Sequence, residues 1–157
     1  MNATNSPPVF PYEPTQDERT FAILAHALQM VGWWIAPLVI LITKRESKFV
    51  SFHTLQALLL QVAYLLGMVL VMMIWFATMF ATMFKQMPTT GQPAGTNVGP
   101  PPLMFVVFPL IWLGWMAGWA VALVASILYS VKAGQGEWAK YPLLGRLARR
   151  ILHLPTT

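Results

Sequence analysis

The side chains of this sequence that are best suited to chemistry are two histidines and the residues of one polar turn. The turn, Lys44–Gln56, is the only strongly polar interruption between two long apolar stretches, and it ends with His53 and Gln56 at the start of the second stretch. His26 lies in the first stretch. Neutral imidazole is the commonest metal ligand in proteins. A bis-histidine metal or haem site is therefore one hypothesis that the surrounding elements must allow or exclude.

Sulfur offers a second possible ligand set, although the chain contains no cysteine. Four methionines at helical spacing would share one face of a helix, and thioethers favour Cu(I). Packing or lipid contact by flexible side chains is the better interpretation of such a row, because nothing else in the sequence supports a copper site. The row consists of Met68, Met72, Met79 and Met83.

The composition is that of a membrane protein. Hydrophobic residues make up 57% of the 157 residues and charged residues 10%, whereas a soluble domain has about 25% charged residues. Uncharged apolar runs above ~18 residues are typical of membrane-spanning helices. We predict an all-α integral membrane protein with a single membrane domain, residues 21–153, that contains three transmembrane helices at about 21–43, 53–84 and 103–131 and an interfacial amphipathic helix at about 142–153.

The segments before and between these helices are polar. Four prolines and a net negative charge predict a disordered tail over residues 1–20. Thr15 or Asp17 is expected to be the N-cap of a helix that begins near Glu18. A loop rich in glycine and proline is predicted over residues 85–102.

The third span carries small residues on one face. Small side chains let another helix approach closely. The approaching helix is either the second span of the same chain or a helix from a second copy in a homo-oligomer. The face consists of Gly114, Gly118, Ala122 and Ser126.

Basic side chains gather in the polar turn and in the amphipathic helix. A basic amphipathic helix beside a span usually lies in the membrane interface, where it is held by apolar burial and by anionic lipid. We therefore predict lipid rather than nucleic acid as the partner of these residues. The candidates for binding lipid headgroups are Lys44, Arg45, Lys48, Arg146, Arg149 and Arg150.

The distribution of charge predicts the orientation. With three spans, the polar turn and the C-terminal tail share one side and carry eight Lys and Arg residues, while the N-terminal tail and the loop share the other side and carry two. An excess of Lys and Arg marks the cytoplasmic side. We predict a multi-pass protein of the cell membrane with its N-terminus outside and its C-terminus in the cytoplasm.

This topology separates the two histidines. His26 would lie near the outer end of the first span and His53 near the inner end of the second, with about 25 Å of helical rise between His26 and Thr43. One metal ion could not bind both imidazoles. His53 and Gln56 are instead expected to hydrogen-bond carbonyls at the C-terminal end of the first span, which Pro37 should kink.

Three sequence motifs carry a resemblance to a known family. DERxxAxLAH leads into the first span and FHxxQAL follows the basic turn, both within residues 17–61, and KAGQGEWAKYPL follows the third span. These motifs resemble a family of small prokaryotic membrane proteins named for its similarity to Tic20, a subunit of the chloroplast inner-envelope protein import translocon. The motif residues that we take as interaction candidates are His26, Phe52, His53, Gln56, Tyr141 and Pro142.

The resemblance implies no established activity for bacterial members and a protein-conducting pore for the plastid relative. The sequence contains no evident nucleophile–base set, and the predicted spans contain no Asp, Glu, Lys or Arg for a proton relay. We therefore expect no enzyme and no bound cofactor or metal. The favoured interpretation is a structural or accessory membrane subunit that binds further copies of itself or another membrane protein. A pore-forming or protein-translocation subunit is the alternative, and a metal or haem carrier is the third interpretation.

Overall fold

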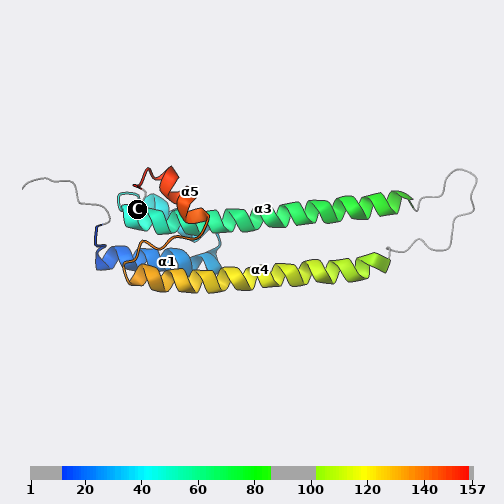
Figure 1. Ribbon diagram of the computed structural model, residues 1–157, viewed down its shortest axis with the longest axis horizontal. Helices are drawn as coiled ribbons and strands as arrows, with labels where there is room; N and C mark the ends of the chain where they lie inside the picture. Colours follow the sequence, from blue (N-terminus) through cyan, green and yellow to red (C-terminus); the bar gives the residue numbers. More distant parts are fainter. Residues whose placement is uncertain (1–11, 86–101, 156–157) are drawn as a thin grey trace, which may run out of the picture. The chain divides into compact units, whose positions relative to one another are not determined.

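The computed structural model describes residues 12–85 and 102–155, and these residues form five helices without strands (Figure 1). The prediction of an all-α protein is confirmed for this part of the chain. Much of the predicted N-terminal tail, residues 1–11, and most of the predicted loop, residues 86–101, lie outside the described residues. The helices are α1 (Gln16–Gly32), α2 (Ile35–Thr43), α3 (Lys48–Lys85), α4 (Pro102–Gly134) and α5 (Leu144–Ile151).

Helix α1 begins inside the predicted tail, at Gln16, because Thr15 caps it. The Glu18 N–H donates to Thr15 Oγ1 at 3.3 Å, and the Glu18 carboxylate accepts a hydrogen bond from the Thr15 N–H at 2.8 Å. This reciprocal pair is a capping box, which satisfies two backbone donors that the helix itself cannot satisfy. The predicted cap at Thr15 is confirmed.

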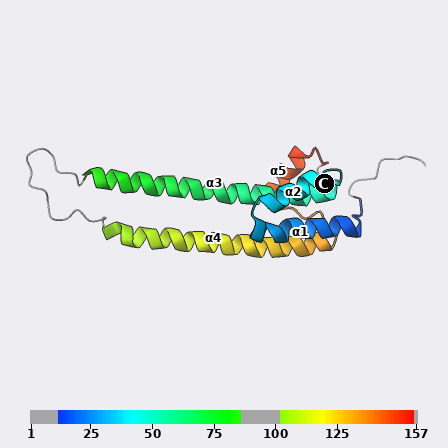
Figure 2. The same cartoon turned by 180° about the vertical axis from the view of Figure 1, so that it is seen from behind.

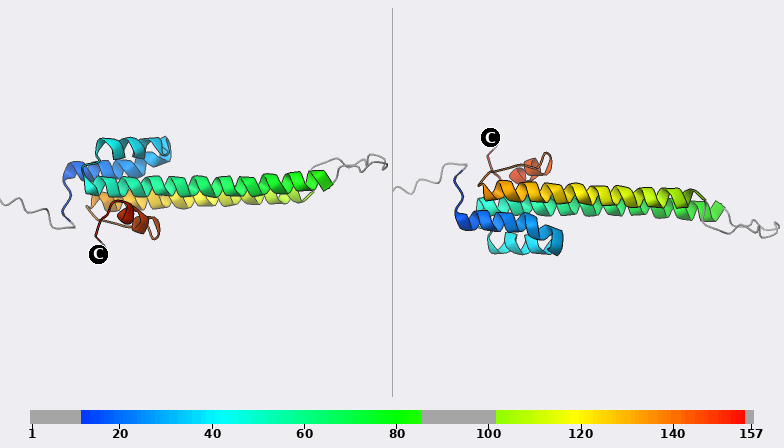
Figure 3. Two further views of the ribbon diagram at one scale, coloured as in Figure 1. Left: turned by 90° about the horizontal axis from the view of Figure 1, so that it is seen from above. Right: turned by 90° about the horizontal axis from the view of Figure 1, so that it is seen from below.

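The predicted span over residues 21–43 is not one helix. It consists of α1 and α2, which pack against each other and are joined by a turn at Trp33 and Trp34 (Figure 3). Pro37 gives the physical reason. In a continuous helix its ring would clash with the Trp33 carbonyl, whereas in the first turn of α2 its missing N–H leaves no hydrogen bond unmade. Trp33 accordingly has a φ of 50°, which a right-handed helix cannot contain.

Helices α3 and α4 are long and apolar enough to cross a membrane. At ~1.5 Å per residue they extend over about 57 Å and about 50 Å, compared with ~30 Å for the hydrocarbon core of a bilayer. Helices α1 and α2 have 17 and 9 residues, and a spanning helix needs ~20 apolar residues. The structure therefore supports two of the three predicted spans.

The chain divides into two compact units. The terminal unit comprises Met1–Ala63 and Ala122–Thr157, and the central unit comprises Tyr64–Val121. Each long helix contributes one part of its length to each unit.

The terminal unit contains α1, α2 and α5 together with the first turns of α3 and the last turns of α4. Figures 1 and 2 show α1 beside the C-terminal part of α4, and Figure 3 shows α2 and α5 on opposite sides of α3. Small residues on α1 allow this close packing. Three apolar clusters hold the helices: Ala22 with Phe49 and Ala133, Ala25 with Ile40 and Val50, and Phe52 with Ala148 and Leu154.

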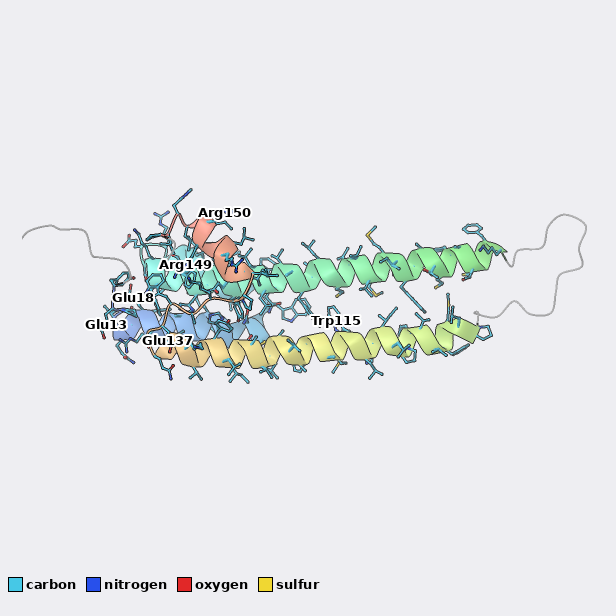
Figure 4. The ribbon with its side chains drawn as sticks, viewed as in Figure 1. Glu13, Glu18, Trp115, Glu137, Arg149 and Arg150 are labelled. Carbon is cyan, nitrogen blue, oxygen red and sulfur yellow. The ribbon has the colours of Figure 1, made fainter. Side chains whose placement is uncertain are left out.

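The central unit is a pair of helical segments held by aromatic contacts. The Tyr64 ring lies 4.1 Å from the Trp115 ring, and the Trp75 ring lies 5.7 Å from the Phe108 ring, measured between centroids. Figure 4 shows Trp115 between α3 and α4. Most of the other large apolar side chains of this unit are exposed, such as Leu66 at 63%. An exposed surface made mainly of apolar side chains is suited to lipid contact.

Candidate functional site

Polar side chains gather inside the terminal unit, where they are shielded from solvent. They come from α1, α3, α4 and the segment before α5, and each is at most 4% exposed. A buried polar group destabilises a protein unless it has a hydrogen-bond partner. The hydrogen bonds among these side chains therefore decide what the site can do. We refer to these residues as the buried polar cluster: His26, Gln29, His53, Thr54, Gln56, Ser126 and Tyr141.

The two histidines form a directional chain of hydrogen bonds. His53 Nε2 lies 3.0 Å from the Glu137 carbonyl oxygen, which can only accept, so we assign the proton to Nε2 and the lone pair to Nδ1. His53 Nδ1 lies 3.2 Å from His26 Nε2, which therefore donates. His26 Nδ1 then accepts from the Tyr141 hydroxyl at 3.4 Å. Burial raises the pKa of Tyr141, which keeps this hydroxyl protonated and able to donate.

The predicted separation of His26 and His53 is wrong. It assumed that α1 crosses the membrane, whereas α1 runs beside the first turns of α3, so that the two imidazoles face each other. All four ring nitrogens of the two histidines take part in these hydrogen bonds. Neither imidazole therefore has a free lone pair that could bind a metal ion in this arrangement. Across residues 12–85 and 102–155, no group of three or more His, Cys, Asp or Glu side chains is placed to hold a metal ion.

Gln56 ties α3 to the segment between α4 and α5. Its Nε2 donates to the Ala139 carbonyl at 3.2 Å, and its Oε1 accepts from the Tyr141 N–H at 2.8 Å. The His53 contact with Glu137 lies in the same segment. The prediction that His53 and Gln56 hydrogen-bond the end of the first span is therefore wrong. Both side chains instead hold the segment between α4 and α5, whose residues lie more than eighty positions away along the chain.

Gln29 and Ser126 connect α1 to α4. The Gln29 Nε2 donates to Ser126 Oγ, whose hydroxyl donates to the Ala122 carbonyl at 2.8 Å. Gln61 Nε2 donates to the Gln29 carbonyl at 3.0 Å, which adds α3 to the contact. Gln29 was not among the predicted interaction candidates, although its position three residues after His26 places both polar side chains on one helix face. That shared face was the available signal.

The predicted small-residue face is used unevenly within the chain. Ser126 is buried in the polar cluster. A Cβ at Gly118 would lie 3.6 Å from the Tyr64 ring, which is ordinary contact, so Gly118 packs against α3. A Cβ at Gly114 would meet nothing within 4 Å among the described residues. Ala122 is only partly buried. The face therefore serves intramolecular packing toward the C-terminal end of α4 and is open at Gly114.

The N-terminal segment lies against the polar turn. Asp17 Oδ2 forms an ion pair with Lys44 Nζ at 3.0 Å, and Ser47 Oγ donates to Glu18 Oε1 at 2.6 Å. The Tyr12 ring meets the Trp138 ring edge-on, with a centroid distance of 5.7 Å. These contacts contradict the predicted placement of the N-terminus and the turn on opposite membrane sides, because groups separated by a bilayer cannot form an ion pair.

The model of the magnetosome magnetite crystal formation protein family (MamF/MmsF) matches residues 17–148. The chain belongs to this family. No curated protein and no solved structure matches the chain. The family match carries no link to Tic20, so the predicted resemblance holds only as membership of a small membrane-protein family without an assigned activity.

The matched region of this magnetosome family member includes the whole buried polar cluster. Of the six predicted motif residues, His26, His53, Gln56 and Tyr141 belong to the cluster. Phe52 is fully buried beside it and packs against Trp138, with ring centroids 5.5 Å apart. Pro142 is exposed in the turn before α5. The motif is thus mainly the set of residues that assembles the terminal unit.

The predicted headgroup candidates do not form one site. Lys44 is engaged by Asp17 and lies over the Phe21 ring, 4.2 Å from its centroid. Arg149 is 5% exposed and donates to the Pro155 carbonyl at 2.8 Å. Lys44 is therefore paired within the chain at the protein surface, and Arg149 is buried. The exposed candidates are Arg45, Lys48, Arg146 and Arg150.

Proposed function

We propose that this chain is a structural, non-enzymatic protein of the magnetosome membrane that takes part in magnetite crystal formation. Membership of the family supports the part in crystal formation, and the two long apolar helices support the membrane location. The buried polar cluster supports a structural function. Its histidines, glutamines and tyrosine hydrogen-bond one another and the backbone beneath the surface, where they hold helices together.

The ion pair between Asp17 and Lys44 carries the topology that we propose, in which α3 and α4 are the two spans. The pair supports a common side for the start of α1 and the turn after α2. In the proposed topology the α1–α2 hairpin enters the bilayer from that side and returns to it. Exposed apolar side chains at the turn and along α2 support this insertion. They include Trp33 at 61%, Ile35 at 57% and Ile42 at 64% exposed.

The charge distribution supports a cytoplasmic location for both ends. With two spans, Arg19 joins the basic side, and Lys85 is left as the one Lys or Arg of the ten that the sequence holds on the other side. This excess is larger than the one predicted from three spans, and Lys and Arg mark the cytoplasmic face. Residues 86–101 then connect the two spans on the opposite face.

Single-cysteine labelling tests this topology, because the chain contains no cysteine of its own. In intact isolated magnetosomes, a membrane-impermeant maleimide should modify Gln16→Cys and Gln135→Cys, both exposed positions of the terminal unit. Thr96→Cys should react only after detergent is added. If Gln16→Cys and Thr96→Cys are instead protected together, the chain has an odd number of spans and the two-span topology is wrong.

Deletion of the gene in a magnetite-forming host tests the function itself. Loss of the protein should change the size or shape of the magnetite crystals seen by electron microscopy, and re-expression of the wild-type chain should restore them. A variant that folds poorly, such as His53→Asn, should restore them incompletely in proportion to its lower protein level. Crystals that remain unchanged after the deletion would exclude a part in crystal formation.

A further inference from the structure

Helix α5 has two faces of different character. Its inner face, formed by Gly145, Ala148 and Arg149, is buried. Ala148 packs with Phe52 of α3, and the Arg149 guanidinium lies 5.5 Å from the centroid of the same ring. Figure 4 shows Arg149 over the first turns of α3 and Arg150 on the outer side of α5. The inner face therefore fixes α5 on the terminal unit and leaves the outer face to meet something else.

The outer face combines an apolar row with a basic row. The N-cap residue Leu143 and the helix residues Leu147 and Ile151 are 77%, 42% and 50% exposed, and their spacing of four residues aligns them along one side. Arg146 and Arg150 are also exposed, and their spacing of four residues makes a second row beside the first. No acidic residue occurs in α5. Three exposed aliphatic side chains beside two arginines are typical of a helix that lies in a membrane interface.

We propose that the outer face of α5 binds the surface of an anionic bilayer. The aliphatic row inserts among the upper parts of the acyl chains, and Arg146 and Arg150 contact the lipid phosphates. Charge complementarity identifies the occupant, because the basic row matches phosphate groups and the apolar row matches acyl chains, and a bilayer surface offers both together. Arginine suits this contact since its planar guanidinium can bind phosphate through two hydrogen bonds.

Helix α5 is also folded and held in place before it meets such a surface. The helix starts ten residues after the end of α4, one of the two candidate spans. Gln56 holds the intervening segment at Ala139 and Tyr141. A helix that is already formed and attached loses little conformational freedom on docking. This inference rests on the proposed membrane location but not on the side of the membrane or on the part in crystal formation.

The test uses the full-length chain in nanodiscs and a spin label on Leu147→Cys. In discs that contain phosphatidylglycerol, the label should be accessible to oxygen and shielded from a water-soluble nickel relaxant. Each arginine near an anionic surface strengthens membrane association about fivefold. The double substitution Arg146→Gln and Arg150→Gln should therefore lower the ratio of inserted to water-exposed label by about 25-fold, as should replacement of the anionic lipid by phosphatidylcholine.

A charge-matched variant separates a specific contact from a general effect of charge. Lys85→Gln with Lys132→Gln also removes two positive charges, from exposed positions that lie outside α5 and outside the headgroup candidates, and it should leave the label inserted. The proposal is overturned if the label is open to the nickel relaxant in anionic discs, if the control pair lowers insertion as much as the α5 pair, or if shielding requires two copies per disc. The labelling of Gln16→Cys and Thr96→Cys reads the topology independently, so a wrong topology and a wrong α5 surface give different results.

Discussion

His26 Nε2 lies 3.2 Å from His53 Nδ1, and neither side chain is exposed to solvent. The contact joins α1 to α3, and the continuation to Glu137 joins both to the segment before α5. The direction of the hydrogen bonds from Tyr141 through His26 and His53 to the Glu137 carbonyl requires two neutral imidazoles. A proton added to His53 Nδ1 would place two N–H donors face to face, so the contact favours the folded terminal unit only while the His53 ring is neutral.

Replacement of His53 by asparagine should destabilise the protein by about 2–4 kcal/mol, which is typical when a buried hydrogen-bonded group loses its partners. The shorter side chain cannot reach both His26 and the Glu137 carbonyl, and it leaves buried polar groups unsatisfied. The measurement is the thermal unfolding of the purified protein in detergent, followed by circular dichroism.

His153→Asn is the matched control for this substitution. His153 is exposed and has a φ of 51°, a conformation that asparagine tolerates well. The control should unfold at the wild-type temperature. Equal unfolding temperatures for wild type, His53→Asn and His153→Asn would show that the histidine pair contributes nothing to the stability of the terminal unit.

The local properties of the fold could be predicted from the sequence. Uncharged runs identify α3 and α4 as candidate spans, because apolar length is a property of a single segment. The Thr15 cap follows from the spacing of Thr15 and Glu18, since a capping box involves only neighbouring residues. The motif residues around His53 were also recognised, although their partners were not.

The long-range contacts could not be predicted in the same way. Pro37 permits either a kink or a complete turn, and only the packing of α2 on α1 decides between them. Once the first span was taken as continuous, His26 was placed far from His53, and Asp17 was placed far from Lys44, with which it forms an ion pair. The partners of Gln56 lie more than eighty residues away, so no local pattern points to them.

The stability of the terminal unit should fall in acid through Glu18. Burial raises the pKa of Glu18, but hydrogen bonds from Ser47, Thr15 and Tyr12 outweigh it, and the net pKa is lowered. A carboxyl group with a lowered folded-state pKa stabilises the protein above its unfolded pKa of about 4.3, and this contribution is lost as the pH falls through the folded-state value.

The substitution Glu18→Gln isolates this contribution. The variant should be less stable than wild type at pH 7, by about 1–2 kcal/mol for the loss of charge-assisted hydrogen bonds. The difference should shrink as the pH falls below about 4. Unfolding temperatures measured for both proteins between pH 3 and pH 7 give the comparison. A difference that stays constant over this range would contradict the assignment to Glu18.

The contact between Gln29 and Ser126 should appear as an energetic coupling between α1 and α4. Gln29→Ala and Ser126→Ala remove the two ends of one buried hydrogen bond. The double variant should therefore lose less stability than the sum of the single variants, with a coupling of about 1 kcal/mol. The pair Gln29→Ala and Ser130→Ala is the control, because Ser130 lies one turn along α4 and contacts the Ile23 carbonyl instead. Equal coupling in both cycles would mean that the Gln29–Ser126 contact is not specific.

Leucine substitutions at Gly118 and Gly114 should separate packing within the chain from association between chains. Gly118→Leu places a large side chain against the Tyr64 ring and should destabilise the α3–α4 packing by about 1–3 kcal/mol. Gly114→Leu points into space that no described residue fills, so a monomer should tolerate it.

The oligomeric state of the Gly114→Leu variant then tests the remaining partner of the small-residue face. If copies of the chain associate through this face, as a pore-forming subunit would require, the leucine blocks the close approach of helix backbones that glycine permits. The variant should then dissociate while its unfolding temperature stays near that of wild type, as measured by light scattering in detergent. If the wild-type protein is instead monomeric in the same detergent and in nanodiscs, the small-residue face serves only the contact with Tyr64. A pore made by several copies would then have to use another surface.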